Sequence, residues 1–188
     1  MNRTSSSVSP CLAIMVVAAS LAVPGFAAEP SSPLEFQRIA GYGGVVRLPD
    51  AGERPRAGGQ VVFDTTAAAV AGKPNRGLDS AARLVNVYVS EGMEQSRPRI
   101  AVILHTGATS AALSDDAHGR SAAGGPNPNR PLVEALVAEG VEVWVCGQSV
   151  IRGGHTLDDV LPGIKVAYSA MIFNINRQAD GWSTLSVH

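Results

Sequence analysis

The sequence is poor in aromatic residues, in net charge and in cysteine. Aromatic residues make up 5% of the 188 residues, the formal net charge is −1, and two cysteines are present. No run of Lys and Arg indicates a nucleic-acid surface, and no acidic tail indicates a disordered segment. With 45% hydrophobic residues, 20 glycines and 12 prolines, the chain is predicted to form one domain with a Val/Ala/Leu core and many turns.

The chain also lacks a hydrophobic run long enough to cross a bilayer. Its longest apolar stretch, 11–23, is interrupted by Ser20 and is shorter than the roughly 18–20 residues that a span needs. Arg3 precedes this stretch and small residues surround Ala27, which is typical of a secretory signal peptide. We therefore predict a signal peptide over residues 1–27 and an exported, periplasmic protein without stable membrane insertion. A short membrane anchor is the alternative.

Removal of a signal peptide leaves Cys146 as the single cysteine, because Cys11 lies inside the removed segment. An intrachain disulfide is then impossible. An odd cysteine in an exported protein is either buried and inert, paired between chains, or reactive. An exposed thiol in an oxidising compartment is a liability unless it has a use.

The rest of the chain alternates between strand-like and helix-like patterns. Residues 28–59, rich in Pro, Gly and Arg, are predicted to form an extended N-terminal arm that packs on a neighbouring subunit or is mobile. Apolar or alternating runs then predict five strands, at 60–64, 99–104, 141–145, 164–167 and, as an edge strand, 182–187. The run 99–104 is continuously apolar, as expected of a strand covered on both faces. The sequence predicts a three-layer α/β/α domain over residues 60–188, with an open, mostly parallel sheet of about five strands.

Capping residues and helical spacing predict the helices. Asn75 and Asn129 are expected to cap the helices that follow the first two strands. Residues 115–131 read as a polar loop, of a length that is usually functional or mobile. A last helix has an apolar face formed by Tyr168, Met171, Ile172 and Ile175.

The candidate chemistry lies where two predicted strands end. Ligand sites in such sheets lie at the carboxyl ends of the strands, and His105 and Cys146 both follow strands. A thiolate at Cys146 can attack a sulfane sulfur or a disulfide, and the backbone amides of residues 147–149 can stabilise it. His105 can take the thiol proton or stabilise the thiolate. The ends of the two strands lie about 5 Å apart if the strands are neighbours and about 10 Å apart if one intervenes.

Each of these two residues also has a structural interpretation. Cysteine packs as a small hydrophobic residue at many strand ends, and His105 can simply bond the loop that follows it. Further candidate ligand-binding residues near the same end are Gln148, Gly147, Asn127, Asn129 and Asp64. Of these, Asn129 is explained by a helix cap, Asn127 by the turn that follows it, and Asp64 by a turn, whereas Gln148 is not explained. No CxxC, HExxH or paired-histidine spacing is present, so neither a metal nor a cofactor is expected.

Several of these segments together resemble the DsrE/DsrF-like family of sulfur-relay proteins. They are Val61–Asp64, Ile100–His105, Asn127–Leu132, Val141–Gln148 and Leu161–Ala167, and the resemblance extends from residue 60 to the C-terminus. It implies that the cysteine at position 146 carries sulfur as a persulfide and that subunits form trimers, hexamers or hetero-oligomers. Many members of the family have no established activity. The signal peptide and the arm depart from the cytoplasmic members, whose usual partners are absent from an export compartment.

The leading hypothesis is an exported sulfur-handling protein that binds or transfers sulfane sulfur as a persulfide on Cys146, as a carrier more than as a fast enzyme. Its partners are expected to be a sulfur donor or acceptor protein, or a small sulfur anion, and further copies of the chain in a trimer or hexamer. One alternative is a non-catalytic oligomeric module that binds a small ligand around Cys146, His105 and Gln148. Another is a thiol redox sensor that forms an intersubunit disulfide.

Overall fold

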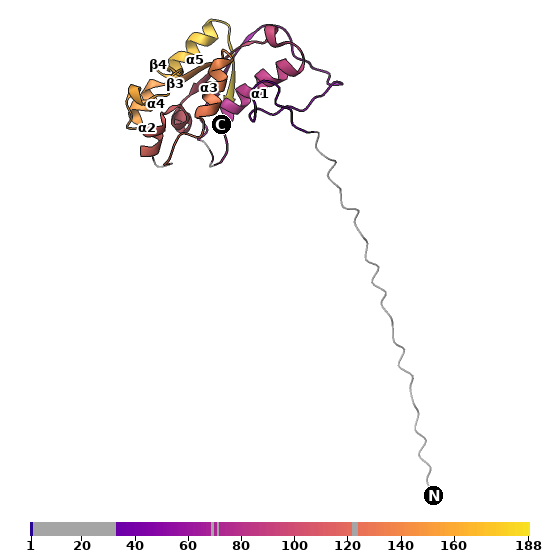
Figure 1. Cartoon of the computed structure of the whole chain (residues 1–188), viewed down its shortest axis with the longest axis horizontal. Coiled ribbons are helices and arrows are strands. Elements are labelled where there is room, and N and C mark those ends of the chain that lie inside the picture. The colour runs from indigo at the N-terminus through magenta and orange to yellow at the C-terminus, as the bar shows by residue number, and fades with distance from the viewer. Residues whose placement is uncertain (2–32, 69, 71, 122–123) are drawn as a thin grey trace. The chain divides into compact units, whose positions relative to one another are not determined.

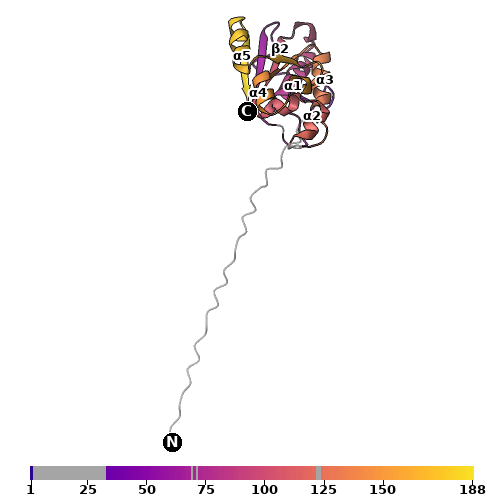
Figure 2. The same ribbon diagram turned by 90° about the vertical axis from the view of Figure 1, so that its left-hand side faces the viewer.

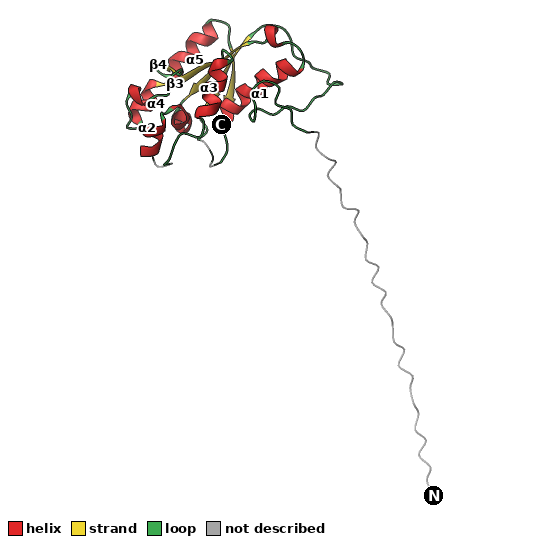
Figure 3. Ribbon diagram, in the orientation of Figure 1, coloured by secondary structure: helices red, strands yellow, loops and turns green. Residues whose placement is uncertain are grey.

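The computed structural model describes Met1 and residues 33–68, 70, 72–121 and 124–188, so the predicted signal peptide lies outside the described residues apart from Met1. Within these ranges no helix is long and apolar enough to cross a membrane. The strands are β1 (Gln60–Thr65), β2 (Arg99–Leu104), β3 (Glu142–Cys146), β4 (Lys165–Ala167) and β5 (Ser183–Val187). The α-helices are α1 (Arg76–Ser90), α2 (Asp115–Arg120), α3 (Arg130–Ala138), α4 (Gly147–Arg152) and α5 (Ala170–Ala179). Three short 3₁₀ helices are η1 (Glu94–Ser96), η2 (Thr106–Ala112) and η3 (Leu157–Asp159) (Figures 1 and 3).

The five strands form one parallel sheet in the order β4-β3-β2-β1-β5, which confirms the predicted fold class and the edge position of β5. From β1 to β4 the chain moves across the sheet in one direction, and it then returns through α5 to the opposite edge. Right-handed crossovers place the helices of the forward steps on one face and the helix of the return step on the other. Figure 2 shows this arrangement, with α1 and α3 on one side of the sheet and α5 on the other.

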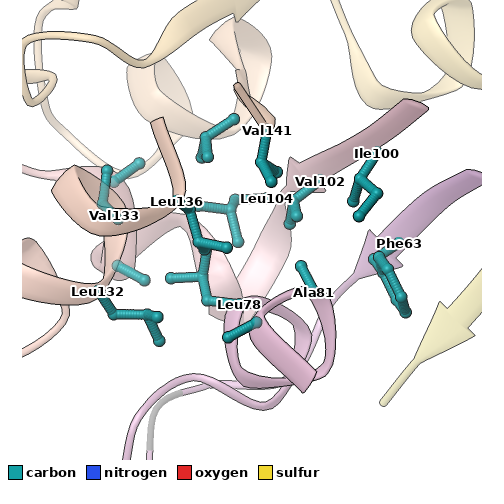
Figure 4. Packing of buried hydrophobic residues seen from close by; sticks show 14 of the residues in the cluster. Phe63, Leu78, Ala81, Ile100, Val102, Leu104, Leu132, Val133, Leu136 and Val141 are labelled. Atoms are coloured by element: carbon teal, nitrogen blue, oxygen red, sulfur yellow. The ribbon is translucent and has the colours of Figure 1, made fainter. Parts of the chain in front are cut away.

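The larger core lies between the sheet and the helices α1 and α3 (Figure 4). Leu78 of α1, Leu132 and Leu136 of α3, and Val102 and Leu104 of β2 are fully buried there. Because alternate side chains of a strand face opposite sides of the sheet, the other residues of the same strands face α5.

The start of α1 agrees with the sequence prediction. The side chain of Asn75 accepts hydrogen bonds from the backbone N–H groups of Gly77 and Leu78, which a helix start otherwise leaves free. A Cβ atom on Gly77 would lie 2.0 Å from Oγ1 of Thr65. Glycine at this position therefore lets the first turn of α1 pack directly on the end of β1.

Asn129 occupies the N-cap position of α3, but the predicted side-chain cap is absent. Asn129 precedes α3, but its side chain makes no capping bond to that helix. Its Oδ1 atom instead accepts the backbone N–H of Asn75 at 2.7 Å. Asn129 therefore joins the start of α3 to the start of α1, a contact between segments that are far apart in the sequence.

The predicted loop 115–131 contains a helix, α2. Ser114 caps it by accepting the N–H of Ala117, and Asp115 and Asp116 occupy its first turn, where negative charge is favourable. This start signal is visible in the sequence, whereas the glycines and prolines that follow it are typical of a loop.

Helix α5 begins at Ala170, after the predicted face residue Tyr168, and the predicted apolar face points away from the sheet. Tyr168 is 78% exposed, Met171 71% and Ile175 56%. The side chains buried against the sheet are Ala170 and Phe173. The helical spacing of apolar residues is correct, but it does not show what covers them.

Residues 33–59 contain little regular structure and lie along α1. The buried side chain of Asn86 in α1 accepts the N–H groups of Arg38 and Ile39 and donates to the carbonyl groups of Tyr42 and Gly43. A buried amide that is saturated in this way fixes the chain around it. The described part of the arm thus packs on its own subunit, and contact with a neighbouring subunit stays a prediction.

Candidate functional site

His105 and Cys146 lie side by side at the carboxyl end of the sheet. Strands β2 and β3 are neighbours, and their last paired residues are Leu104 and Val145. His105 and Cys146 each come one position later, so their backbones are about 5 Å apart. Of the two predicted distances between the strand ends, the structure has the shorter one, because no strand lies between β2 and β3. Both side chains point to the α5 face, because Leu104 and Val145 point to the face that α1 and α3 cover.

Both residues line an open cavity of about 680 Å³ between the strand ends, α4 and the start of α5. Its volume lies in the range of small-molecule sites. The polar side chains that line it include His105, Gln148, Ser149, Arg152 and Asn174. Arg152 lies in the last turn of α4 and is exposed, and its guanidinium has no ion-pair partner among the described residues.

The sulfur of Cys146 is surrounded by hydrogen-bond donors. Cys146 is only 5% exposed, and burial by itself raises the pKa of its thiol. The side chain of Ser149 and the backbone N–H groups of Ala170, Ser149 and Gln148 act in the opposite direction, and the pKa is lowered overall. Because these groups lie in the first turns of α4 and α5, two helix starts meet at the sulfur. The arrangement favours the thiolate, which is the nucleophilic form.

Gly147 explains how α4 can begin directly after β3. The chain passes from Cys146 into the helix without a loop. A Cβ atom on Gly147 would lie 3.1 Å from the carbonyl oxygen of Ala167 and 3.1 Å from a methyl carbon of Val166. Glycine therefore lets the start of α4 approach β4 closely, which places the first amides of the helix at the sulfur of Cys146.

His105 is held by a carboxylate. Its Nε2 atom lies 2.8 Å from Oδ1 of Asp64 on β1, and its backbone N–H donates to the carbonyl of Thr65. The hydrogen bond from His105 is the main cause of a lowered pKa at Asp64; burial opposes it, and a hydrogen bond from Asn174 adds to it. Since an ionised carboxylate only accepts hydrogen bonds, Nε2 of His105 carries a proton.

The structure brings some of the predicted site residues together and separates others. The cavity is lined by His105, Cys146 and Gln148. Asp64 does not line the cavity, but it is hydrogen-bonded to His105. Asn127 and Asn129 are buried elsewhere, at 3% and 0% exposure. Asn127 donates to the carbonyl groups of residues 111 and 113 and accepts the N–H of Asn129. Their bonds support the loops before α3, and a role in ligand binding stays a prediction for both.

Sequence reasoning missed Ser149, Arg152 and Asn174 as cavity residues. Ser149 lies inside the segment whose backbone amides are predicted to face the sulfur, but that prediction does not include its hydroxyl. The place of Arg152 in the cavity can be deduced only when α4 is known, because the helix puts Arg152 one turn after Gln148. Asn174 lies on α5, and no sequence signal connects it to Asp64.

A second cavity, of about 440 Å³, lies near the start of β2. Its charged side chains neutralise one another: Arg38 pairs with Glu94 at 3.6 Å, and Arg97 pairs with Glu139 at 3.4 Å. In the described ranges, no group of three or more His, Cys, Asp or Glu side chains is placed to hold a metal ion. The cavity beside Cys146 is therefore the candidate site.

Comparisons with known proteins give a family match and several similar solved structures. The DsrE/DsrF-like family matches residues 60–187. Among solved structures, the protein of unknown function MTH1491 from Methanobacterium thermoautotrophicum is 21% identical, with a TM-score of 0.49 over 69% of this chain and 99% of that one. The ychN protein from E. coli is 16% identical, with a TM-score of 0.46 over 69% and 99% of the two chains. Comparison with curated proteins yields no match.

Proposed function

Since this chain belongs to the DsrE/DsrF-like family, we propose that it is an exported sulfur-handling protein that carries sulfane sulfur as a persulfide on Cys146. The observation that supports this most is the environment of the sulfur. Helix N–H groups and a hydroxyl lower the pKa of the Cys146 thiol, and the sulfur faces a cavity large enough for a small donor.

The transfer step needs no external oxidant. The thiolate of Cys146 attacks the terminal sulfur of thiosulfate or of a polysulfide. A bond forms between Sγ and that sulfur, the sulfur–sulfur bond of the donor breaks, and its electron pair leaves with sulfite or with the shortened polysulfide. The product is a persulfide anion, whose terminal sulfur lies about 2 Å further into the cavity. An acceptor thiolate removes this sulfur by the same reaction.

Mass spectrometry of the full chain tests the proposal. After incubation with thiosulfate or polysulfide, the protein should gain about 32 Da, the mass of one sulfur atom. Peptide mapping should place the addition on Cys146. The Cys11→Ser variant should keep the addition and the Cys146→Ala variant should lose it. A wild-type protein that gains no mass with any sulfane donor would refute the proposal.

The geometry gives less support to a redox sensor. An intersubunit disulfide requires two sulfur atoms to approach to about 2 Å, whereas Cys146 is 5% exposed and lines a cavity. A non-catalytic ligand-binding module uses the same cavity and differs from the carrier in forming no covalent addition. The mass measurement therefore separates the two.

Export is a further part of the proposal, and it is supported by the pattern of residues 1–27. Expression in a Gram-negative host should place the protein in the periplasmic fraction. N-terminal sequencing of that fraction should begin at residue 28. Recovery of the uncleaved chain in the membrane fraction would instead indicate an anchor.

Association of copies of the chain is also proposed, through the outer face of α5. Met171, Ile172 and Ile175 lie at helical spacing on α5, Tyr168 lies two residues before its first residue, and the four side chains are 44–78% exposed. Neighbouring apolar side chains with this exposure are typical of a surface that another protein covers. Light scattering should show a trimer or a hexamer, which Ile175→Asp should dissociate. Leu48→Asp, at another exposed apolar position (64%), is the matched control and should leave the assembly intact.

A further inference from the structure

We infer that Asp64 is a positioning residue for Cys146: it fixes the ring of His105 so that Nδ1 takes the proton of the Cys146 thiol. This inference rests on the proposed function, because it assigns a role within the same site. It goes beyond that function by adding a third strand to the site and by defining which nitrogen of His105 acts.

Three neighbouring strands each supply one group. The order β3-β2-β1 places His105 between Cys146 and Asp64. Asp64 pairs in register with Ile103, which lies two positions before His105, so the three side chains point to the same face. The contact between Asp64 Oδ1 and His105 Nε2 is 2.8 Å long. No partner of Nδ1 is found among the described residues, and the His105 side chain lines the cavity beside Cys146.

The tautomer follows from this contact. A carboxylate can only accept, so neutral His105 carries its proton on Nε2 and presents a free electron pair at Nδ1. The thiol proton of Cys146 then moves to Nδ1, which leaves a thiolate beside an imidazolium whose charge Asp64 balances. When sulfur has been transferred, the same proton can return to the departing anion. No electrons are exchanged in these steps.

The side-chain amide of Asn174 on α5 also acts on Asp64, because it adds to the lowering of the pKa of this carboxyl. The other end of this amide, Oδ1, is buried and has no hydrogen-bond partner in the described part of the chain. A buried acceptor without a hydrogen-bond partner is unfavourable. The fold thus keeps an unfavourable group next to the Asp64–His105 pair, which is common where function determines the arrangement.

The remaining charged groups around the pair are few. Arg152 of α4 lines the same cavity. His188 contributes to the lowered pKa of Asp64, and its Nδ1 lies 2.9 Å from Oγ1 of Thr66. Neither group contacts His105 among the described hydrogen bonds and ion pairs. Asp64 is therefore the group that distinguishes the two nitrogens of this ring.

The test is the variant Asp64→Asn, which keeps the shape of the side chain but cannot balance an imidazolium. Alkylation of Cys146 by iodoacetamide, followed against pH in a Cys11→Ser background, reports the thiolate. A rise of one unit in the pKa of Cys146 leaves about tenfold less thiolate at neutral pH, and the greater nucleophilicity of the more basic thiolate reduces the loss to about threefold. We therefore expect a three- to tenfold slower reaction at neutral pH and a profile displaced to higher pH.

Two further readouts exclude a purely structural role. Nitrogen NMR of His105 should show the Nε2–H tautomer in the wild type and a mixture of tautomers in Asp64→Asn. In the double variant with His105→Gln, loss of Asp64 should add nothing to the loss caused by His105→Gln alone, because both act through one ring. Glu142→Gln removes a carboxylate at the other end of the sheet and should leave the alkylation profile unchanged. If Asp64→Asn does not fold, Asn174→Ala should displace the profile in the same direction by less.

The outcomes separate this inference from the proposed function. An unchanged alkylation profile in folded Asp64→Asn, or additive effects in the double variant, would overturn the inference even if the wild type forms a persulfide. A displaced profile without persulfide in the wild type would support the inference and refute the proposed function, because alkylation requires no sulfur donor.

Discussion

Replacement of Ser149 by alanine tests whether donors around Cys146 make its thiol reactive. The Ser149 hydroxyl is the first of the groups that lower the pKa of Cys146, and the backbone donors stay in place when it is removed. The hydroxyl also accepts the N–H of Thr106 at 3.3 Å, in an exposed position where water can replace it. The substitution therefore removes one donor from the sulfur with little other change.

The expected size follows from the strength of one hydrogen bond. A hydrogen bond to a charged group contributes about 1.5 kcal/mol, and one pKa unit corresponds to about 1.4 kcal/mol. The pKa of Cys146 should therefore rise by about one unit in Ser149→Ala. Ser149→Thr keeps the hydroxyl and should stay close to the wild type. Ser80→Ala removes an exposed hydroxyl that bonds the carbonyl of Arg76 in α1, and it serves as the distant control.

The assay is the pH dependence of iodoacetamide alkylation, with the ultraviolet absorbance of the thiolate as a second measurement. Both should give a midpoint about one unit higher in Ser149→Ala than in the wild type. A midpoint that does not move would mean that the hydroxyl does not donate to the sulfur. Equal displacement in Ser80→Ala would mean that the effect is not local to the site.

Three further predictions concern the cavity, the core and the response to acid. Arg152→Gln should slow persulfide formation from anionic thiosulfate about three- to tenfold without slowing alkylation by neutral iodoacetamide, because only thiosulfate is attracted by the positive charge of Arg152. Equal slowing of both reactions would refute a role of Arg152 in anion binding. Phe173→Ala should lower the free energy of unfolding by about 3–5 kcal/mol in urea titrations, whereas Ile172→Ala, at a position 44% exposed, should lower it far less. The folded state lowers the pKa of Asp64. The ionised Asp64 carboxylate should therefore contribute fully to the free energy of unfolding above about pH 4, and this contribution should disappear as the pH falls through the lower pKa of the folded state. The free energy of unfolding of Asp64→Asn should lack this part of the pH dependence.

Much of the sheet was predictable because its strands are marked by local signals. Strand β2 spans the residues that its continuous apolar run predicts, since a strand buried on both faces admits no polar residue. The strand before Cys146 has a similar local signal, so the place of Cys146 at a carboxyl end was predictable as well. The distance from Cys146 to His105 could not be predicted, because it depends on the strand order, and many strand orders satisfy the same hydrophobic pattern.

The contacts that fix the site were harder to predict because they join distant segments. Asn129 has the sequence context of a helix cap, yet its side chain bonds the backbone of Asn75. Asp64 has the context of a turn, yet it holds His105. A polar side chain satisfies whichever partner the tertiary structure brings within reach, and local sequence does not determine that partner.

Helix α5 connects the two surfaces that the proposals involve. Its inner side supplies the N–H of Ala170 to Cys146 and the side chain of Asn174 to Asp64. Met171 lines the cavity and is nevertheless 71% exposed, so it forms part of the cavity rim and part of the outer apolar face. A second copy of the chain that covers this face would narrow the entrance to Cys146. Alkylation of Cys146 should then become faster when the assembly is diluted to its monomer or dissociated by Ile175→Asp. Equal rates in the assembled and the dissociated protein would mean that the entrance lies outside the interface between copies.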